Sequence, residues 1–224
     1  MRVLLIRHGE TPLNVAGVLD AVVPGPGLTD LGRQQAAALP RALAGEPVDE
    51  VRCSSMVRTC ETAEPLARDR GLRPVLLDGV QEIEAGALQG RDDRAAIGRY
   101  LTTVHAWSDG SLAPRIPGGP DGREFLARFD AALARLDAER RTAGLHGAVA
   151  VVTHSAAIRV WCARRARNLP ADFSARQPLA NTAVVAVEGS ADDGWIITDW
   201  AGSPVAAPPS RGADPMGEPL ADLD

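Results

Sequence analysis

The chain has 224 residues, 45% of them hydrophobic and 24% charged, with a formal net charge of −5 at pH 7. This composition is ordinary for a packed globular protein, and it excludes the overall positive field that would hold nucleic acid or an anionic membrane surface. Any anionic ligand must therefore be held by a local group of cations. All 24 cationic side chains other than histidine are arginines, whose planar forks match phosphate or carboxylate oxygens in pairs.

The sequence carries no pattern of export, membrane insertion or a structural metal. Its apolar start, residues 1–10, is too short a run for the core of a signal peptide, and no stretch of about 18 apolar residues occurs. Cys53, Cys60 and Cys162 are odd in number and form no Cys-x-x-Cys pair, so they indicate neither a disulfide framework nor a zinc site. We expect a soluble cytoplasmic protein with no membrane, nucleic-acid or metal partner.

Short aliphatic runs alternate with helical segments along the chain. In chain order, the pattern predicts a strand over residues 3–6, a helix over 29–43 capped by Thr29, a strand over 51–53, a helix over 56–70 closed by Gly71, and a strand over 75–77. It then predicts helices over 92–107 and 123–141, a strand over 148–152, a helix that ends near residue 167, and strands over 183–187 and 195–200. This alternation predicts an α/β fold, a three-layer sandwich whose mostly parallel central sheet is flanked by helices.

Residues 1–202 are expected to form one domain, and the composition changes after them. Residues 203–224 are rich in proline, alanine and acidic residues, with five prolines among 22 residues. Such a segment cannot bury enough apolar surface to offset the entropy lost on ordering it. We expect a partly disordered tail.

Two histidines directly follow predicted strands that are far apart in the chain. His8 comes after the strand at residues 3–6, and His154 comes after the strand at residues 148–152. Ligands of α/β proteins bind at the edge where the carboxyl ends of the strands meet, so we expect both side chains in one site. A neutral histidine can attack phosphorus and form a covalent intermediate.

Phosphoryl chemistry also needs cations and a proton donor close to the nucleophile. Arg7 adjoins His8, and Arg58 lies early in the helix after the second strand, where backbone amides add a weak anion site. A carboxyl group is the best donor of the proton that the leaving alkoxide takes. Glu82, in the loop after the third strand, is the better placed candidate, with Glu84 as the alternative.

Five short motifs occur in a fixed order between residues 3 and 165. They are Arg7-His8-Gly9-Glu10-Thr11 with Asn14; Leu28-Thr29-xx-Gly32-xx-Gln35-Ala36; Ser54-Ser55-Met56-x-Arg58-Thr59-Cys60-x-Thr62-Ala63; Glu82-xxx-Gly86-Ala87-Leu88-Gln89-Gly90; and Thr153-His154-Ser155-xx-Ile158-Arg159. In this order the motifs resemble those of the histidine phosphatase superfamily, which has the phosphoglycerate mutase-like fold. One Arg-His-Gly alone is a weak signal, whereas the ordered set is specific.

The resemblance implies a role for each matching residue. His8 would be the nucleophile that forms a phosphohistidine, and Glu82 would be the proton donor and later the base for water. The phosphoryl group and the substrate would be held by Arg7, Arg58, His154 and Asn14. No cofactor or metal would be needed, because arginines and a protonated histidine would supply the electrostatic stabilisation. The implied function is a phosphomonoesterase that hydrolyses a small phosphorylated metabolite.

Two departures from the family pattern bear on how a substrate is bound. Ser155 stands where the family usually has glycine after its second histidine, and it adds a side chain to the wall of the expected pocket. Residues 15–27 depart from the usual glycine-rich substrate loop, so the family does not define recognition there. We include Ser155 among the expected substrate-binding residues.

Two other functions remain open on the sequence. Residues 86–90 resemble a sequence motif of the 2,3-bisphosphoglycerate-dependent phosphoglycerate mutases, which return the phosphoryl group to their substrate. Against a mutase, no paired arginines followed by prolines occur in residues 90–119, and Ala85 stands where the mutases have tyrosine. The third candidate is a catalytically silent phospholigand-binding protein. The oligomeric state is also open, with a homodimer as the commonest arrangement.

Overall fold

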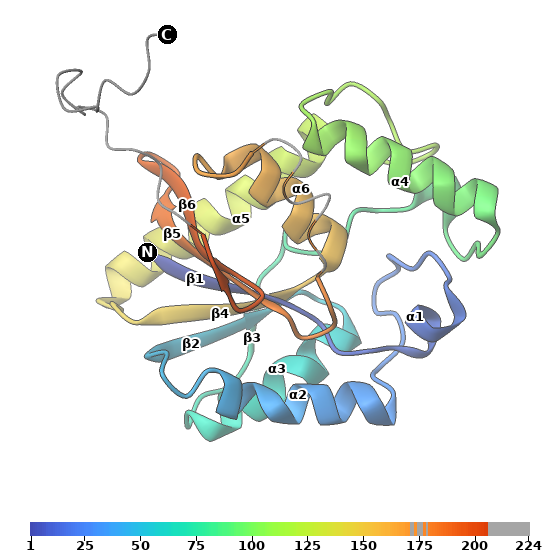
Figure 1. Ribbon diagram of the computed structural model, residues 1–224. Coiled ribbons are helices and arrows are strands. Elements are labelled where there is room, and N and C mark those ends of the chain that lie inside the picture. Colours follow the sequence, from blue (N-terminus) through green and yellow to red (C-terminus); the bar gives the residue numbers. More distant parts are fainter. Residues whose placement is uncertain (171–172, 174–176, 178, 206–224) are drawn as a thin grey trace, which may run out of the picture.

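The computed structural model describes residues 1–170, 173, 177 and 179–205, which fold into layers of helices around a sheet (Figure 1). The strands are β1 (Arg2–Arg7), β2 (Val48–Cys53), β3 (Val75–Leu76), β4 (Ala148–Thr153), β5 (Val184–Ser190), β6 (Gly194–Trp200) and β7 (Ser203–Pro204). The helices are α1 (Pro12–Ala16), α2 (Asp30–Ala42), α3 (Val57–Asp69), α4 (Arg94–Ser108), α5 (Gly122–Ala143) and α6 (Ser155–Arg165), with the 3-10 turn η1 (Gly86–Leu88).

Within the described residues the strands form one seven-stranded sheet in the order β3-β2-β4-β1-β5-β6-β7. The strands β3, β2, β4 and β1 pair in parallel, and β5, β6 and β7 extend the sheet by antiparallel pairing. Because β6 is antiparallel to β5, it runs in the same direction as β1, and five of the seven strands in the described part of the chain share that direction. The predicted α/β sandwich with a mostly parallel sheet is confirmed.

Alternate residues of the central strands face two separate cores, because successive side chains of a strand point to opposite faces. On one face, Val3 and Leu5 of β1 join a large core with α4, α5 and α6, which contains the fully buried Trp161. On the other face, Leu4 and Ile6 join a smaller core with α2 and α3. Figure 1 shows these layers, with α2 and α3 below the sheet and α5 and α6 above it.

The predicted elements all occur, with shifts at their ends. Thr29 caps α2 as predicted, since its Oγ1 accepts a hydrogen bond from Gly32 N–H at 3.0 Å. The helix predicted to reach residue 167 ends at Arg165, because Ala166 turns extended and forms a bridge with Trp195 of β6. The strand predicted to begin at residue 51 begins at Val48, because the polar Asp49 and Glu50 interrupt its apolar pattern. The pairing with β4 also shifts register between Val48 and Glu50.

The chain after residue 202 begins as a strand. Ser203 and Pro204 form β7 and pair with Trp200 and Asp199 of β6. Most of the tail that the sequence predicts to be partly disordered, residues 206–224, lies outside the described residues. No helix in the described part of the chain is long and apolar enough to cross a membrane.

Three parallel strands end at one edge of the sheet and position the residues that follow them. The register aligns the last residues of β1 and β4 with each other, and β2 ends beside them. His8 N–H donates to Thr153 O at 3.0 Å, and Ser54 N–H donates to Val152 O at 3.1 Å. The residues that come next after β1, β2 and β4 therefore lie together at this edge.

Candidate active site

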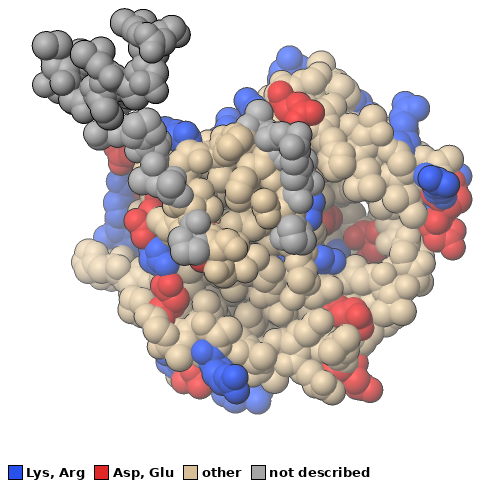
Figure 2. Space-filling view, in the orientation of Figure 1, with Lys and Arg blue, Asp and Glu red and all other residues tan. Residues whose placement is uncertain are grey.

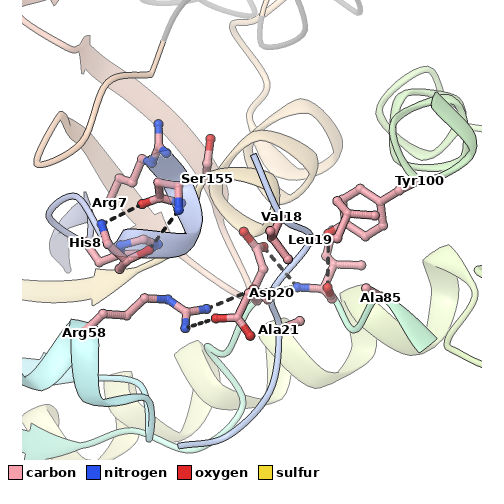
Figure 3. A pocket seen from close by; sticks show the side chains of 14 residues that line it. Arg7, His8, Val18, Leu19, Asp20, Ala21, Arg58, Ala85, Tyr100 and Ser155 are labelled. Atoms are coloured by element: carbon pink, nitrogen blue, oxygen red, sulfur yellow. Dashed lines mark hydrogen bonds and ion pairs between the residues drawn. The ribbon is translucent and has the colours of Figure 1, made fainter. Parts of the chain in front are cut away.

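A cavity of about 150 Å³ opens at this edge of the sheet. Its floor is the end of β1 and the start of α3, and its walls are residues 18–21, residues 82–85, α4 and the start of α6 (Figure 3). Six of the site residues predicted from the sequence line the cavity: Arg7, His8, Asn14, Arg58, Glu82 and Ser155. The seventh, His154, does not. In the space-filling view, both acidic and arginine atoms appear in the hollow between the α1 and α4 sides of the molecule (Figure 2).

His8 is buried, and its ring is held in one tautomer. Nδ1 lies 2.7 Å from Gly9 O. Because a carbonyl oxygen can only accept, Nδ1 carries the proton of the neutral ring, and Nε2 keeps its lone pair. Burial first, and then the positive charge of Arg58, lower the pKa of His8 to about 3. At neutral pH the ring is uncharged, and Nε2 has the lone pair that a nucleophile needs.

His154 lies behind the cavity, fully buried, with its ring centroid 5.2 Å from that of His8. Its Nε2 lies 2.9 Å from Ser54 Oγ, which is 2.9 Å from Thr59 Oγ1. The Thr59 hydroxyl donates to Met56 O at 2.7 Å, so Ser54 donates to Thr59 and accepts from His154 Nε2–H. Burial, with the nearby His8 and arginine charges, lowers the pKa of His154 well below its usual value.

Arg7 and Arg58 bring two guanidinium groups to the cavity, from the end of β1 and the first turn of α3. Arg7 Nη1 donates to Leu179 O at 2.7 Å, and Arg58 Nη1 lies 3.0 Å from Asp20 Oδ2. Burial lowers the pKa of both guanidinium groups. The Nε atom of each is buried without a partner.

Unpartnered polar atoms gather at this cavity. Seven buried side-chain nitrogen or oxygen atoms in the described residues have no hydrogen-bond partner, and three of them are Arg7 Nε, Arg58 Nε and His154 Nδ1. An unsatisfied buried donor costs about 1–3 kcal/mol. An anion whose oxygens accept from the two arginine N–H groups would remove that cost, so the arrangement suits an oxyanion such as phosphate. His154 Nδ1 becomes a third donor only when its ring is protonated.

Glu82 lies in the loop after β3, and its carboxylate is held at the start of α6. Oε1 accepts from Ala157 N–H at 2.9 Å, and Oε2 accepts from Ala156 N–H at 3.2 Å. Arg128 of α5 holds the backbone of the same residue by donating to Glu82 O at 3.1 Å. Glu84, the alternative proton donor, has a side chain that is 52% exposed and does not line the cavity.

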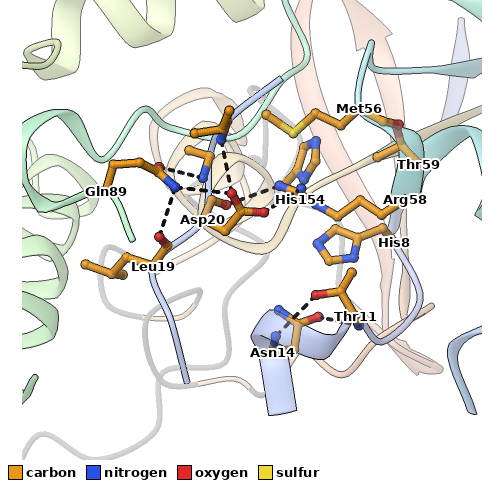
Figure 4. Close-up of polar contacts among 12 residues, drawn as sticks. His8, Thr11, Asn14, Leu19, Asp20, Met56, Arg58, Thr59, Gln89 and His154 are labelled. Atoms are coloured by element: carbon orange, nitrogen blue, oxygen red, sulfur yellow. Dashed lines mark hydrogen bonds and ion pairs between the residues drawn. The ribbon is translucent and has the colours of Figure 1, made fainter. Parts of the chain in front are cut away.

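The two remaining predicted residues line the cavity from different helices, α1 and α6. Asn14 belongs to α1, where its Oδ1 accepts from Thr11 N–H at 3.1 Å (Figure 4). This bond uses the amide oxygen and leaves the amide nitrogen as a donor. Ser155 is the first residue of α6, and it lines the cavity where the family pattern has only hydrogen. Both side chains can donate a hydrogen bond to a ligand in the cavity.

Close backbone packing brings the first three motifs together. A Cβ at Gly9 would lie 2.6 Å from Gly32 O, and a Cβ at Gly32 would lie 2.1 Å from Glu10 O. Gly9 N–H also donates to Thr62 Oγ1 at 2.9 Å, which ties the histidine loop to α3. These glycines are therefore required because two segments of backbone touch, and the contact fixes the start of the loop that carries His8.

Three residues at the site are not predicted by the sequence. Asp20 pairs with Arg58, and its position in residues 15–27, where the chain departs from the family pattern, is the one signal for it. Asn181 Nδ2 donates to His8 O at 3.0 Å, although nothing in the loop before β5 indicates it. Arg128 lies on the helix α5, and nothing in the sequence distinguishes it from the other arginines of that helix. Among the described residues, no group of three or more His, Cys, Asp or Glu side chains is arranged to hold a metal ion.

The sheet topology, together with two histidines and two arginines at its carboxyl edge, defines a phosphoglycerate mutase-like protein. The sequence model of the histidine phosphatase superfamily (branch 1) matches residues 3–202. The chain belongs to this superfamily, and the predicted family and fold are confirmed. The prediction that the chain is an enzyme of the phosphatase class is confirmed at the level of this family.

Comparison with curated relatives gives similar proteins with several names. PE-PGRS family protein PE_PGRS11 of Mycobacterium tuberculosis is 36% identical over 211 residues, which are 89% of this chain and 36% of that protein, so the chain spans about a third of its length. Adenosylcobalamin/alpha-ribazole phosphatase of Salmonella typhimurium is 34% identical over 62% of this chain and 68% of its own. A protein named "Probable phosphoglycerate mutase GpmB" of Proteus mirabilis is 28% identical over 89% of this chain and 90% of its own.

Solved structures resemble the fold over nearly the whole described chain. The structure of mycobacterial glucosyl-3-phosphoglycerate phosphatase with VO3 has a TM-score of 0.74 at 24% identity, and the match covers 90% of this chain and 99% of that one. This likeness shows the fold.

Proposed function

We propose that the chain is a phosphomonoesterase that hydrolyses a small phosphorylated metabolite through a phosphohistidine on His8. One observation carries the proposal: a neutral histidine with a free Nε2 lone pair shares a cavity with two buried guanidinium N–H groups that have no acceptor, those of Arg7 and Arg58. A phosphate dianion satisfies these donors with its oxygens and offers its phosphorus to the histidine.

In the first step, His8 Nε2 attacks phosphorus, and the bond from phosphorus to the ester oxygen breaks. Glu82, in its protonated form, gives its proton to that oxygen, so the alcohol leaves neutral. The α6 amides and Arg128 fix the position of this carboxyl group before substrate arrives. Arg7 and Arg58 stabilise the charge that spreads over the remaining phosphoryl oxygens.

In the second step, water attacks the phosphorus of the phosphohistidine. The Glu82 carboxylate takes a proton from this water, the bond between His8 Nε2 and phosphorus breaks, and inorganic phosphate and the neutral histidine are restored. His8 Nδ1–H donates to Gly9 O in both steps, which keeps the ring in one orientation. A bound dianion raises the pKa of His154, because a nearby opposite charge favours the charged form, and Nδ1–H then donates to a phosphoryl oxygen.

The size of the cavity and the name of a relative support a small phosphorylated metabolite as the substrate class. About 150 Å³ holds a phosphoryl group and a few further atoms, which is less than the roughly 300–1,000 Å³ of sites that enclose a whole drug-sized ligand. The rest of a substrate therefore extends through the opening. The named activity of one relative, an adenosylcobalamin/alpha-ribazole phosphatase, also supports a small phosphorylated metabolite.

A phosphoglycerate mutase is the second candidate, because residues 86–90 resemble the mutase pattern and one relative carries that name. A mutase must hold the second charged end of its substrate while the phosphoryl group is on the enzyme. Among the described residues that line the cavity, the arginines are Arg7 and Arg58, both at the phosphoryl end, while Ala85 and Leu19 form apolar wall. This distribution of charge favours water over a returning substrate as the final acceptor.

The test is to trap the intermediate and to identify the acceptor. The chain is incubated with p-nitrophenyl phosphate and quenched in alkali, and intact mass and phosphate release are measured. We expect release of phosphate, one acid-labile phosphoryl group on His8, and no effect of a metal chelator. Absence of both phosphate release and phosphohistidine would support the silent ligand-binding protein, and conversion of 3-phosphoglycerate to its isomer after priming with 2,3-bisphosphoglycerate would support the mutase. A panel of phosphorylated metabolites then ranks the substrates.

A further inference from the structure

Asp20 brings a carboxylate into the cavity beside the arginine that is expected to bind phosphate. Its Oδ2 lies 3.0 Å from Arg58 Nη1, and its backbone oxygen accepts from Arg58 Nη2 at 3.2 Å. The side chain is only 10% exposed, and it lines the cavity with His8 and Glu82. Figure 3 shows the carboxylate reaching Arg58 from the opposite wall of the cavity.

The position of Asp20 is fixed by the loop that precedes α4. Gln89 Nε2 donates to Asp20 Oδ1 at 3.2 Å, and Gln89 Oε1 accepts from Ala21 N–H at 2.9 Å (Figure 4). The backbones of the two segments also pair, since Gly90 N–H donates to Leu19 O at 2.9 Å. The carboxylate is therefore held from both sides and forms part of the wall.

The ion pair leaves part of Arg58 available for a phosphoryl oxygen. Asp20 occupies Nη1 and Nη2, while Nε is buried and has no partner. One guanidinium group has five N–H donors, so it can contact phosphate with one edge and Asp20 with another. A phosphoryl group bound to Arg58 would then lie close to a fixed negative charge.

We propose that Asp20 is a specificity-determining residue that selects against phosphomonoesters with a second anionic group near the ester. It favours leaving groups with hydroxyl or ammonium donors, which can bind its oxygens. This inference rests on the proposed function and deepens it. It also bears on the mutase alternative, because a phosphoglycerate carries a carboxylate close to its phosphate.

The physical reason for this selection is the balance of charge in the cavity once a phosphoryl group is bound. The phosphoryl group neutralises Arg7 and Arg58, and Glu82 is protonated when it acts as proton donor, so the charged side chain that remains among the described lining residues is Asp20. Two like charges in a partly desolvated site repel far more strongly than they do in water, which discriminates between partners of different charge. A substrate carboxylate would meet this repulsion with no cation left to pair with.

The test compares three phosphomonoesters that differ in the charge of the leaving group. They are 2-aminoethyl phosphate, glycerol 3-phosphate and 3-phosphoglycerate, with a cationic, a neutral and an anionic leaving group. For the wild-type chain we expect kcat/KM to fall in that order. Asp20→Asn and Asp20→Ala should raise kcat/KM for 3-phosphoglycerate relative to glycerol 3-phosphate by about tenfold, chiefly through KM. Asp30→Asn removes an exposed acid and should leave the ratio unchanged.

Several results would overturn the inference. A wild-type chain that prefers 3-phosphoglycerate to glycerol 3-phosphate contradicts it without any variant, so the test does not depend on the folding of the variants. Equal losses on all three substrates in both Asp20 variants would show that Asp20 only holds Arg58 in place. If the wild-type chain hydrolyses none of the three esters and forms no phosphohistidine with p-nitrophenyl phosphate, the proposed function itself has failed, and that outcome is distinct from an unchanged ratio.

Discussion

The floor and the outer wall of the cavity are built in different ways. The floor residues His8 and Arg58 follow directly from regular elements, at the end of β1 and in the first turn of α3, and both are buried. The wall at residues 18–21 is a loop of half-buried residues that is joined to the next loop by Gln89 and by backbone hydrogen bonds. The nucleophile and the phosphate-binding Arg58 thus rest on regular elements, the proton donor Glu82 rests on a loop that α5 and α6 hold in place, and selection among substrates rests on the loop at residues 18–21.

This division predicts that variants of the floor lose the reaction with every substrate, whereas variants of the wall at residues 18–21 change the ranking of substrates. Arg128 lies on α5, and its guanidinium group donates to the backbone of Gln81 and Glu82 in the loop that lines the cavity. It therefore connects the helix layer beside the sheet with the loop that carries the proton donor. The four predictions that follow separate the parts by the size and the kind of effect.

The largest effect is expected for His8→Ala. Without the nucleophile, kcat should fall by at least about a thousandfold on every substrate, while the fold is kept. Steady-state hydrolysis of p-nitrophenyl phosphate and alkaline phosphohistidine trapping measure the loss. His105→Ala, which alters an exposed histidine of α4, is the matched control and should retain full activity. Residual activity above about 1% in His8→Ala would contradict covalent catalysis by this residue.

Glu82→Gln should lower kcat about a hundredfold on alkyl phosphates and much less on aryl phosphates, because a phenolate leaves without a proton from the enzyme. Glycerol 3-phosphate and p-nitrophenyl phosphate are the two substrates to compare. The control is Glu84→Gln, whose carboxylate is exposed and lies outside the cavity. An equal loss on both substrates would remove the role of Glu82 as proton donor.

The burial of His8 should also make the free energy of unfolding of the chain depend on pH. The pKa is about 3 in the folded chain, against 6.5 for an ordinary histidine. Between these values the unfolded chain binds one more proton, so stability is complete above the higher value and falls as pH falls through the window. The slope is at most about 1.4 kcal/mol per pH unit for one proton.

His8→Asn should remove this contribution. Denaturant unfolding at pH 7 and pH 5 should show a loss of free energy of unfolding in the wild-type chain that exceeds the loss in His8→Asn by up to about 2 kcal/mol. Other acidic groups titrate in both chains and cancel in the comparison. Equal losses in the two chains would mean that His8 is readily protonated in the folded state.

The contrast between floor and wall also explains what could be predicted from the sequence. β4 is buried along its whole length and has a continuous apolar run, so its position and the histidine after it follow from the sequence. Arg7, Arg58 and Glu82 occur in motifs of fixed spacing, because each is set by a regular element or by close backbone packing such as that of Gly9. Local constraints of this kind leave a pattern in the chain.

Contacts between distant loops leave no such pattern. Asp20 meets Arg58 across 38 residues, and Asn181 meets His8 across 173 residues. Neither pair has a periodicity or a spacing that could indicate it. The short elements α1, η1 and β7 were missed for a related reason, because two to five residues are too few to show a period.

Arg128 is the best test of how the floor and the wall are connected, and its expected effect is the smallest of the four. Its Nη1 donates to Gly79 O and Gln81 O, and its Nη2 to Glu82 O, each at 3.1 Å. Arg128→Met keeps the length of the side chain and removes these bonds. We expect kcat on alkyl phosphates to fall about tenfold with little change in KM, since the proton donor is positioned less well while the phosphate site is kept.

Arg135→Met is the matched control, because Arg135 lies on the same helix and donates to Asp78 O of the same loop at 2.6 Å. It loses a contact of the same kind at a residue outside the cavity, so its kcat should stay within about twofold of wild type. If Arg128 acts through Glu82, adding Arg128→Met to Glu82→Gln should lower kcat no further, because the group that it positions is already gone. Additive losses in the double variant would show instead that Arg128 only stabilises the loop, and the two parts of the cavity would then be independent.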